Sequence, residues 1–477
     1  MLLLCTVILA KARSRPIRQA TLLIASYALY FTWGVWFAAV LLTSTVMNYL
    51  VGEWLRRKRS GLVLFLGIFL NLALLSTFKY LPEAAVHLPF SSLQRLAYLA
   101  LPLGISFWTF QAMSYLFDVY QGDDVDPSFF EFALYMVFFP VMISGPVCRM
   151  PEMLPQFRSE IVTRRDDIAR GFQRIATGVL MMQLAKLLGQ GILAGDGINS
   201  GFDRVANWSG PDVWCLAFGY GLQLFFDFAG YSHIAIGAAQ ALGFTIPENF
   251  ARPFESTSPS IFWTRWHMSL SFWIRDYVFF PLMRLRREAW WRNISLLIAM
   301  VLFGLWHRAS VVFLLWGAYH GALLLLHRQV EGWQRRFDWT PPRIPWAVLS
   351  WISTISLINL GWIFFRANSL SRARLMFAAI LAPQTYSSHF LTGSLYFMII
   401  ALAMGYAVVS LLTDAMDRYS IESEDPAKSA SHLPMIALVA RWRWYWLPPL
   451  FFLALVFVLI VTLTRGPSTA QFMYGNF

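Results

Sequence analysis

Two histidines lie close together in a strongly apolar part of the chain. They are His307 and His320, within the stretch FGLWHRASVVFLLWGAYHG at residues 303–321. The run 311–326 around His320 holds no other ionisable side chain except Tyr319. A titratable group in such a run points to function, because polarity is expensive to bury in hydrocarbon.

The spacing also predicts how deep each histidine lies. If the chain turns at 308–310, His320 is about ten residues into the next helix, or roughly 15 Å at about 1.5 Å per residue. That is half of a hydrocarbon core roughly 30 Å thick. We therefore expect His320 near the bilayer midplane and His307 near a membrane surface.

The residues alone leave the role of His320 open. A neutral imidazole can act as a general base and take the proton of a hydroxyl. It can also carry protons in a transporter, or simply form a hydrogen bond between helices.

Other polar residues have simpler alternatives. His307 can cap a helix end, and His267 can sit at the membrane interface. Asp227 is the only acid in the run 213–228, where structural pairing is the simpler account and orientation of a histidine the functional one. The sequence has no nucleotide-binding loop, no Gly-x-Ser-x-Gly elbow and no Cys/His metal spacing, so no metal site is expected.

The composition indicates a membrane protein made of helices. Of the 477 residues, 57% are hydrophobic and only 13% are charged, about half the charged share of a soluble protein. The net charge of +12 comes from basic residues in short loops beside apolar runs. That pattern sets membrane orientation and does not indicate a nucleic-acid partner. The three cysteines show no paired spacing, so no disulfide framework is expected.

Basic clusters predict how the chain begins. Residues 11–18 and 56–59 are both basic, so both should face the cytoplasm. The stretch 21–50 must then cross the membrane twice or re-enter, with a turn near Trp33 and Gly34. We expect residues 1–10 to be a membrane segment and not a cleaved signal peptide.

Apolar runs continue to the end of the chain. We expect roughly ten to twelve membrane segments in one integral membrane domain spanning residues 1–477, with Gly230 separating two of the segments. The stretch 259–280 differs, because its aromatic residues recur on one face and predict an amphipathic interfacial helix. The main expected segments are 61–80, 96–120, 129–143, 175–192, 211–228, 231–244, 294–306, 311–326, 346–365, 390–412 and 446–463.

Taken together, several short motifs resemble the membrane-bound O-acyltransferase family, in its alginate O-acetylase and D-alanyl-transfer branch. Each motif is weak alone, but they occur in family order over most of the chain. They are NLALLSTFKY (71–80), FPVMISGP (139–146) with Arg149, FDFAGYS (226–232), PENF (247–250), FWTRWHMSLS (262–271), the histidine stretch 303–321, FFRA (364–367) and QFMYGNF (471–477).

The resemblance implies a funnel-shaped or ring-shaped helical bundle with a tunnel through the membrane. It implies acyl transfer to a hydroxyl, with His320 as the signature catalytic residue and His307 as a second catalytic histidine. His267 matches a further histidine of the branch. We expect supporting or substrate-binding roles for His267, Trp306, Arg308, Asp227 and Asn249.

Two residues depart from the family pattern. Arg308 stands where the family usually has glycine, which places a charge at the entrance of the expected site. His233 follows the Gly-Tyr-Ser segment, where an aspartate or an apolar residue is usual.

These observations predict a multi-pass O-acyltransferase of the bacterial cytoplasmic membrane. It would move an acyl group, most simply acetyl, to a hydroxyl of a cell-envelope or exported polysaccharide. We expect no tightly bound cofactor. The co-substrate would be an acyl donor such as acetyl-CoA or an acylated carrier protein. Membrane lipid and a periplasmic or extracellular acyl-transfer protein are the expected partners.

Two alternatives follow from the same residues. The first is D-alanyl transfer from a carrier protein toward teichoic acid. The second is a proton-coupled transporter or flippase, although the internal repeats common in transporters are absent from the sequence.

Overall fold

Helices make up nearly all of the computed structural model, which describes residues 1–11, 14–85, 95–159, 163–191, 196–204, 208–423 and 456. The only β-pairing in this part is an isolated bridge between Phe250 and Trp266. In the N-terminal half the elements are α1 (Leu2–Lys11), α2 (Arg15–Phe31), α3 (Val35–Arg57), α4 (Gly61–Lys79), α5 (Leu81–Ala85), η1 (Arg95–Tyr98), α7 (Ile105–Gln121), α8 (Phe129–Val137), α9 (Met150–Arg158), α10 (Arg165–Gln190), α11 (Ile198–Asp203) and α12 (Gly210–Ala241). The second half contains η2 (Pro253–Glu255), α13 (Pro259–Trp263), α14 (Met268–Ile274), the π-helical turn η3 (Arg275–Phe279), α15 (Phe280–Arg284), α16 (Ala289–His307), α17 (Val311–Arg336), α18 (Arg343–Arg366), α19 (Leu370–Leu381), η4 (Pro383–Ser387) and α20 (Gly393–Ser423).

Seven of the described helices are long and apolar enough to cross a membrane. They are α3, α4, α12, α16, α17, α18 and the part of α20 from Gly393 to Thr413. This confirms a polytopic, all-α membrane protein. The other predicted segments correspond to shorter or more polar helices, and the segment 446–463 lies outside the described residues except for residue 456.

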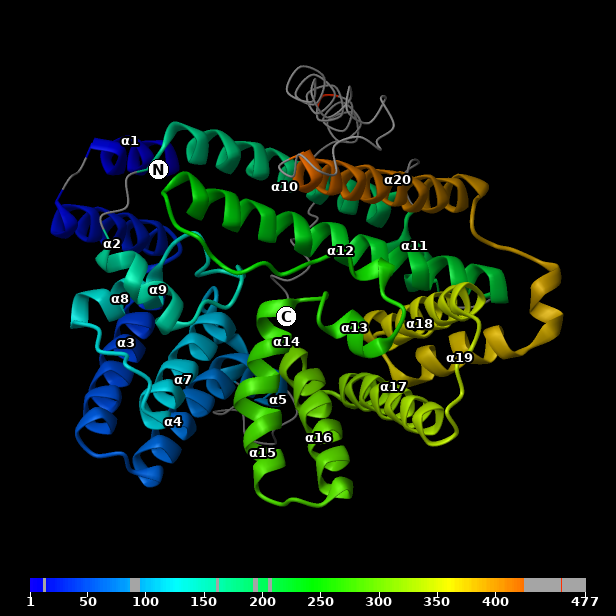
Figure 1. Cartoon of the computed structure of the whole chain (residues 1–477), viewed down its shortest axis with the longest axis horizontal. Helices are drawn as coiled ribbons and strands as arrows, with labels where there is room; N and C mark the ends of the chain where they lie inside the picture. Colours follow the sequence, from blue (N-terminus) through cyan, green and yellow to red (C-terminus); the bar gives the residue numbers. More distant parts are fainter. Residues whose placement is uncertain are drawn as a thin grey trace.

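The turn predicted near Trp33 and Gly34 is present. Helices α2 and α3 are separated by a turn at residues 32–34, where Gly34 has φ +139°, a conformation that favours glycine. Helices α3, α4 and α7 then pack as one bundle, at the lower left of Figure 1. Inside it the side-chain amides of Asn48 and Asn71 donate to each other's carbonyl oxygens, at 3.1 and 2.6 Å.

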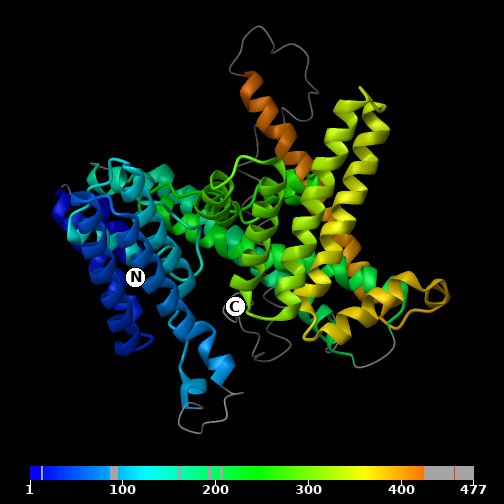
Figure 2. The same cartoon turned by 90° about the horizontal axis from the view of Figure 1, so that it is seen from below.

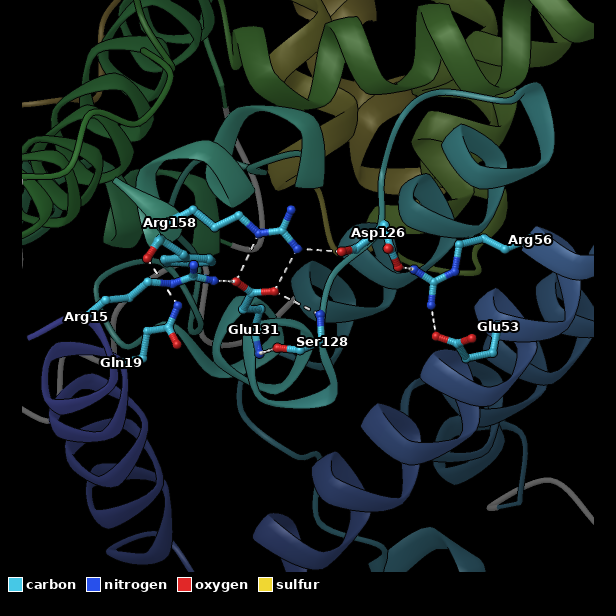
Figure 3. A network of polar contacts seen from close by, with 9 residues as sticks. Arg15, Gln19, Glu53, Arg56, Asp126, Ser128, Glu131 and Arg158 are labelled. Atoms are coloured by element: carbon cyan, nitrogen blue, oxygen red, sulfur yellow. Dashed lines mark hydrogen bonds and ion pairs between the residues drawn. The ribbon is translucent and has the colours of Figure 1, made fainter. Parts of the chain in front are cut away.

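One buried carboxylate ties the first helices to the rest of the protein. Glu131, at the start of α8, is 1% exposed and pairs with Arg15 of α2 and Arg158 of α9 (Figure 3). It also accepts from the backbone N–H of Ser128 at 2.8 Å, closing a capping box. Burial by itself would raise the pKa of Glu131, but hydrogen bonds from Arg158 and Ser128 outweigh it and hold the pKa at about 2.

Helix α12 is longer than the sequence pattern suggested. The expected break at Gly230 is wrong, because residues 210–241 form a single helix with no left-handed residue at 230. Gly230 instead faces Gly178 of α10, where a Cβ atom on either would overlap the other's carbonyl oxygen. Small residues thus let two helix backbones approach closely. Figure 1 shows α10 and α12 running alongside each other.

The stretch 259–280 is not the continuous amphipathic helix that its spacing predicted. It is divided into α13, α14 and η3, and the chain breaks at His267, whose φ of +43° is left-handed. Trp263, Trp266 and Trp273 are all buried inside the protein. Aromatic residues at helical spacing suit a packed interior as well as a membrane interface, and in this protein they pack in the interior.

The predicted hairpin of the two histidines is present. Helix α16 ends at His307, and α17 begins at Val311. Ser310 caps the start of α17, because its hydroxyl accepts a hydrogen bond from the N–H of Phe313. Helix α18 packs along α17, and the two form the upright yellow-green pair in Figure 2. Gly304 and Gly317 permit the close approach of α16 and α17, since a Cβ at either would overlap a carbonyl of the other helix.

Candidate active site

His320 lies within a wall of aromatic rings. It is the tenth residue of α17, as the depth argument required, and its side chain is fully buried. Its ring centroid is 4.9 Å from that of Trp316, 5.3 Å from Trp263, 5.4 Å from Tyr319 and 6.0 Å from Trp362. Three elements, α13, α17 and α18, therefore position one imidazole.

None of these rings offers His320 a hydrogen bond. Both of its ring nitrogens are buried and have no hydrogen-bond partner among the described residues. The indole N–H groups of Trp263, Trp316 and Trp362 are also buried without a hydrogen-bond partner among the described residues. Gly361 faces Nε2 so closely that a Cβ atom there would overlap it. Buried polar groups are nearly always satisfied, so a group of unsatisfied ones calls for an explanation.

His307 is joined to His320 through a shared ring. Its centroid is 5.4 Å from Trp316, which also contacts His320, and 4.6 Å from Trp306. It ends α16 as expected, but its side chain is 3% exposed and turns into the protein. The backbone of His307 therefore lies at a helix end, as expected, but its imidazole is not at the surface.

His267 and Asn249 belong to a neighbouring hydrogen-bonded group. The imidazole of His267 is buried 4.5 Å from the ring of Phe228. Asn249 accepts from the Ser269 hydroxyl at 2.6 Å and donates to Ser232 of α12 at 3.0 Å. Its backbone carbonyl accepts from Met268 N–H at 2.9 Å. Asn249 thus fixes the left-handed break at His267 against α12 and acts as a structural support.

The remaining expected site residues differ in how far they are buried. Asp227 is buried on α12 beside Phe228, and His233 lies further along the same helix. Trp306 is buried and packs at 5.3 Å from Phe110. Arg308 is different, because its side chain is 53% exposed and forms an ion pair with Glu83 at 2.6 Å. It faces away from the ring cluster at the surface.

The sequence patterns did not reveal that Gly361 and three tryptophans, Trp263, Trp316 and Trp362, surround His320. Trp316 could have been found, because it lies four residues before His320 on the same helix face. Trp263 and Trp362 come from distant segments, and nothing local connects them to His320. Among the described residues, no three His, Cys, Asp or Glu side chains gather in a way that could hold a metal ion.

Fold and site together define a polytopic helical membrane protein with paired histidines buried in an aromatic interior. Residues 20–367 match the model of the membrane-bound O-acyltransferase family, and the chain belongs to this family. It is therefore a membrane O-acyltransferase, which excludes the transporter alternative.

Curated relatives agree with this assignment. The chain is 33% identical to a probable alginate O-acetylase of Pseudomonas syringae pv. tomato, over 87% of this chain and 80% of the relative. It is 31% identical to a peptidoglycan O-acetyltransferase of Helicobacter pylori, over 76% of this chain and 74% of the relative. A teichoic acid D-alanyltransferase of Bacillus subtilis is 29% identical, over 55% of this chain and 68% of the relative.

Proposed function

We propose that this enzyme transfers an acetyl group to a hydroxyl of a cell-envelope or exported polysaccharide, with His320 as the general base. The observation that carries the proposal is the fully buried imidazole of His320, whose two nitrogens have no protein partner among the described residues. Acetyl is preferred over D-alanyl because the similarity to relatives named as O-acetylases is higher and covers more of the chain.

The proposed step balances without a metal. A neutral ring nitrogen of His320 takes the proton of the acceptor hydroxyl while the oxygen attacks the thioester carbonyl of the donor. Collapse of the tetrahedral intermediate breaks the carbon–sulfur bond, and the imidazolium returns the proton to the leaving thiolate. The surrounding rings exclude water, which would otherwise compete as acceptor.

Supporting roles follow from position. His307 shares Trp316 with His320, so it is suited to hold or relay a proton beside the base. Trp306 forms the next ring outward from His307. The tunnel by which donor and acceptor reach His320 belongs to this proposal, as does a donor that arrives from the cytoplasmic side as acetyl-CoA or an acylated carrier.

The proposal places the enzyme in the bacterial cytoplasmic membrane. Donor and polymer would then lie on opposite faces, so an external partner protein that receives the acetyl group and passes it to the polymer fits the same chemistry. D-alanyl transfer from a carrier protein stays the second candidate, favoured by the likeness to the teichoic acid D-alanyltransferase.

The function can be tested in inside-out membrane vesicles. Vesicles that hold the enzyme and enclose the polymer, with radiolabelled acetyl-CoA added outside, should produce polymer carrying label in base-labile esters, and vesicles without the enzyme should not. Label incorporated only from a D-alanyl carrier would replace the first candidate with the second. No incorporation from either donor would contradict the proposal.

A further inference from the structure

The structure places a half-buried lysine beside the candidate active site, with no matching anion among the described residues. Lys79 is the last residue of α4, and its ammonium lies 4.7 Å from the ring centroid of Trp306. Its one hydrogen bond, to the hydroxyl of Ser106, is long at 3.5 Å. No carboxylate among the described residues forms an ion pair with it. An unpaired ammonium in a membrane protein is costly, which makes it a candidate for function.

Lys79 belongs to the end of the molecule where His307 lies. The hydroxyl of Tyr80 donates to the backbone carbonyls of Leu305 and Trp306, at 3.2 Å each, and so joins the ends of α4 and α16. The Trp306 ring contacts both the Lys79 ammonium and His307. Its indole N–H is buried with no partner among the described residues. Two hydrogen-bond donors at this end therefore have unused capacity for a negatively charged ligand.

Arg308 binds the acid that lies nearest to Lys79 in the sequence. Glu83 is the acid nearest to Lys79 in the sequence, and it lies on α5 just after the break at Tyr80 that ends α4. The guanidinium of Arg308 takes this carboxylate through hydrogen bonds of 2.6 and 3.1 Å. The Glu83 carboxylate is thus already held by Arg308, and Lys79 has no ion-pair partner among the described residues.

Charge distribution indicates which face of the membrane this end meets. Helix α4 begins after the basic residues 56–59, and α16 begins after the basic residues 284–287. Both clusters should be cytoplasmic. Since α4 ends at Lys79 and α16 at His307, these residues lie toward the opposite face, where an envelope polymer is found.

We propose that Lys79 recognises the acceptor by binding an anionic group, carboxylate or phosphate, near the hydroxyl that is acylated, and that Arg308 keeps Glu83 from neutralising it. This inference rests on the proposed function, because it assumes that an acceptor polymer enters at this end. A charge-assisted hydrogen bond in a poorly solvated site is stronger than a neutral one and would give selectivity for charged acceptors.

Binding measurements on the purified full chain test the proposal apart from catalysis. Equilibrium dialysis would use radiolabelled oligomers of a uronic acid, of glycerol phosphate and of neutral glucose. We expect Lys79→Gln to weaken binding of at least one charged oligomer by about 10-fold to 100-fold and to leave the neutral oligomer unaffected. Lys79→Arg should retain the preference, and the preferred oligomer distinguishes carboxylate from phosphate. The matched control is Lys58→Gln, which removes one charge at the cytoplasmic end and should change nothing.

A second set of variants leaves Lys79 intact. Arg308→Gly should weaken binding of the charged oligomer by about 10-fold, because Glu83 is then free to pair with Lys79. Adding Glu83→Gln to that variant should restore binding to within about threefold of wild type. If the double variant binds as weakly as Arg308→Gly, Arg308 does not protect Lys79.

The outcomes separate this inference from the proposed function. Wild-type protein that prefers a charged oligomer but transfers no acetyl group would overturn the proposed function and support the role of Lys79. Wild-type protein that transfers acetyl but binds charged and neutral oligomers equally would overturn the role of Lys79 alone. A Lys79→Gln variant that keeps the wild-type preference would overturn it as well.

Discussion

The imidazole of His320 is held in place by ring packing alone. Trp316 and Trp263 meet it edge-on at 4.9 and 5.3 Å, and no described side chain or backbone group hydrogen-bonds to either nitrogen. A catalytic base needs a fixed ring and a free lone pair. Aromatic packing fixes the ring of His320 and leaves its lone pair free, which suits His320 to act as the proposed base.

The close packing of Gly361 against His320 gives a sharp test of this arrangement. A methyl group at Gly361 would overlap Nε2 of His320, so Gly361→Ala should displace the imidazole and lower acyl transfer by at least about 10-fold, since small misplacements of catalytic groups are expensive. The matched control is Gly332→Ala on α17, where a Cβ meets nothing within 4 Å. Equal activity of both variants in the acetyl-transfer assay would show that the position of Nε2 does not matter.

At this scale the sequence was informative about single residues and uninformative about their neighbours. His320 could be singled out because an imidazole in a hydrocarbon run is expensive. Trp362 could not, because it is an ordinary apolar residue of α18 until the fold brings it to 6.0 Å from His320. Arg308 seemed to guard the site entrance, yet its guanidinium is bound to Glu83 at the surface.

Helix boundaries marked by a clear turn sequence could be predicted. Whether a long apolar stretch forms one helix or breaks into several could not. The hairpin of α16 and α17 follows from a short polar turn between two apolar runs. The continuity of α12 through Gly230 and the break at His267 both depend on tertiary packing. A glycine can serve as a turn or as a close-contact point, and only the position of α10 decides which applies at Gly230.

The Glu131 network predicts how pH affects the docking of α2, α8 and α9. The folded pKa of about 2 lies below the usual value of 4.5, so the ionised carboxylate stabilises the fold. This contribution is complete above about pH 4.5 and is lost as the pH falls toward 2. Because both arginine partners are more than a third exposed, we expect Glu131→Gln to cost about 1–3 kcal/mol at neutral pH.

Thermal unfolding in detergent at pH 7, 5 and 3 would measure this effect. The difference between wild type and Glu131→Gln should shrink at pH 3, because the Glu131 carboxyl of the unfolded chain is protonated there while that of the folded protein is still largely ionised. Glu288→Gln, an exposed acid at the start of α16, is the control and should match wild type throughout. A Glu131→Gln difference that grows on acidification would have the wrong sign for this account.

For the molecule as a whole, charge and helix ends predict one orientation. The basic clusters at 56–59 and 284–287 should face the cytoplasm, and the turn at 308–310 should face outward. The three native cysteines are buried, so single introduced cysteines can be labelled against a low background. In spheroplasts, an impermeant maleimide should label Ala309→Cys, but should reach Lys58→Cys and Arg287→Cys only after permeabilisation. Labelling of positions 58 and 309 from the same face would contradict the orientation and the outward position of Lys79.

The class of the molecule was the most predictable feature of all. Apolar composition and the scarcity of charge suffice for a polytopic helical membrane protein, and seven described helices confirm it. The way those helices bring α13, α17 and α18 to one histidine depends on contacts between distant segments, which no local pattern records.

His320 is the proposed base for acyl transfer. Purified wild-type enzyme and His320→Ala would be compared for acetyl transfer from labelled donor to acceptor. His327→Ala serves as the control on the same helix, because His327 contacts Ser260 and lies near Glu331, away from the aromatic wall. We predict that His320→Ala loses about 10²-fold to 10⁴-fold in rate and that His327→Ala stays within about twofold of wild type. A folded His320→Ala enzyme that transfers acetyl at the wild-type rate would contradict the account.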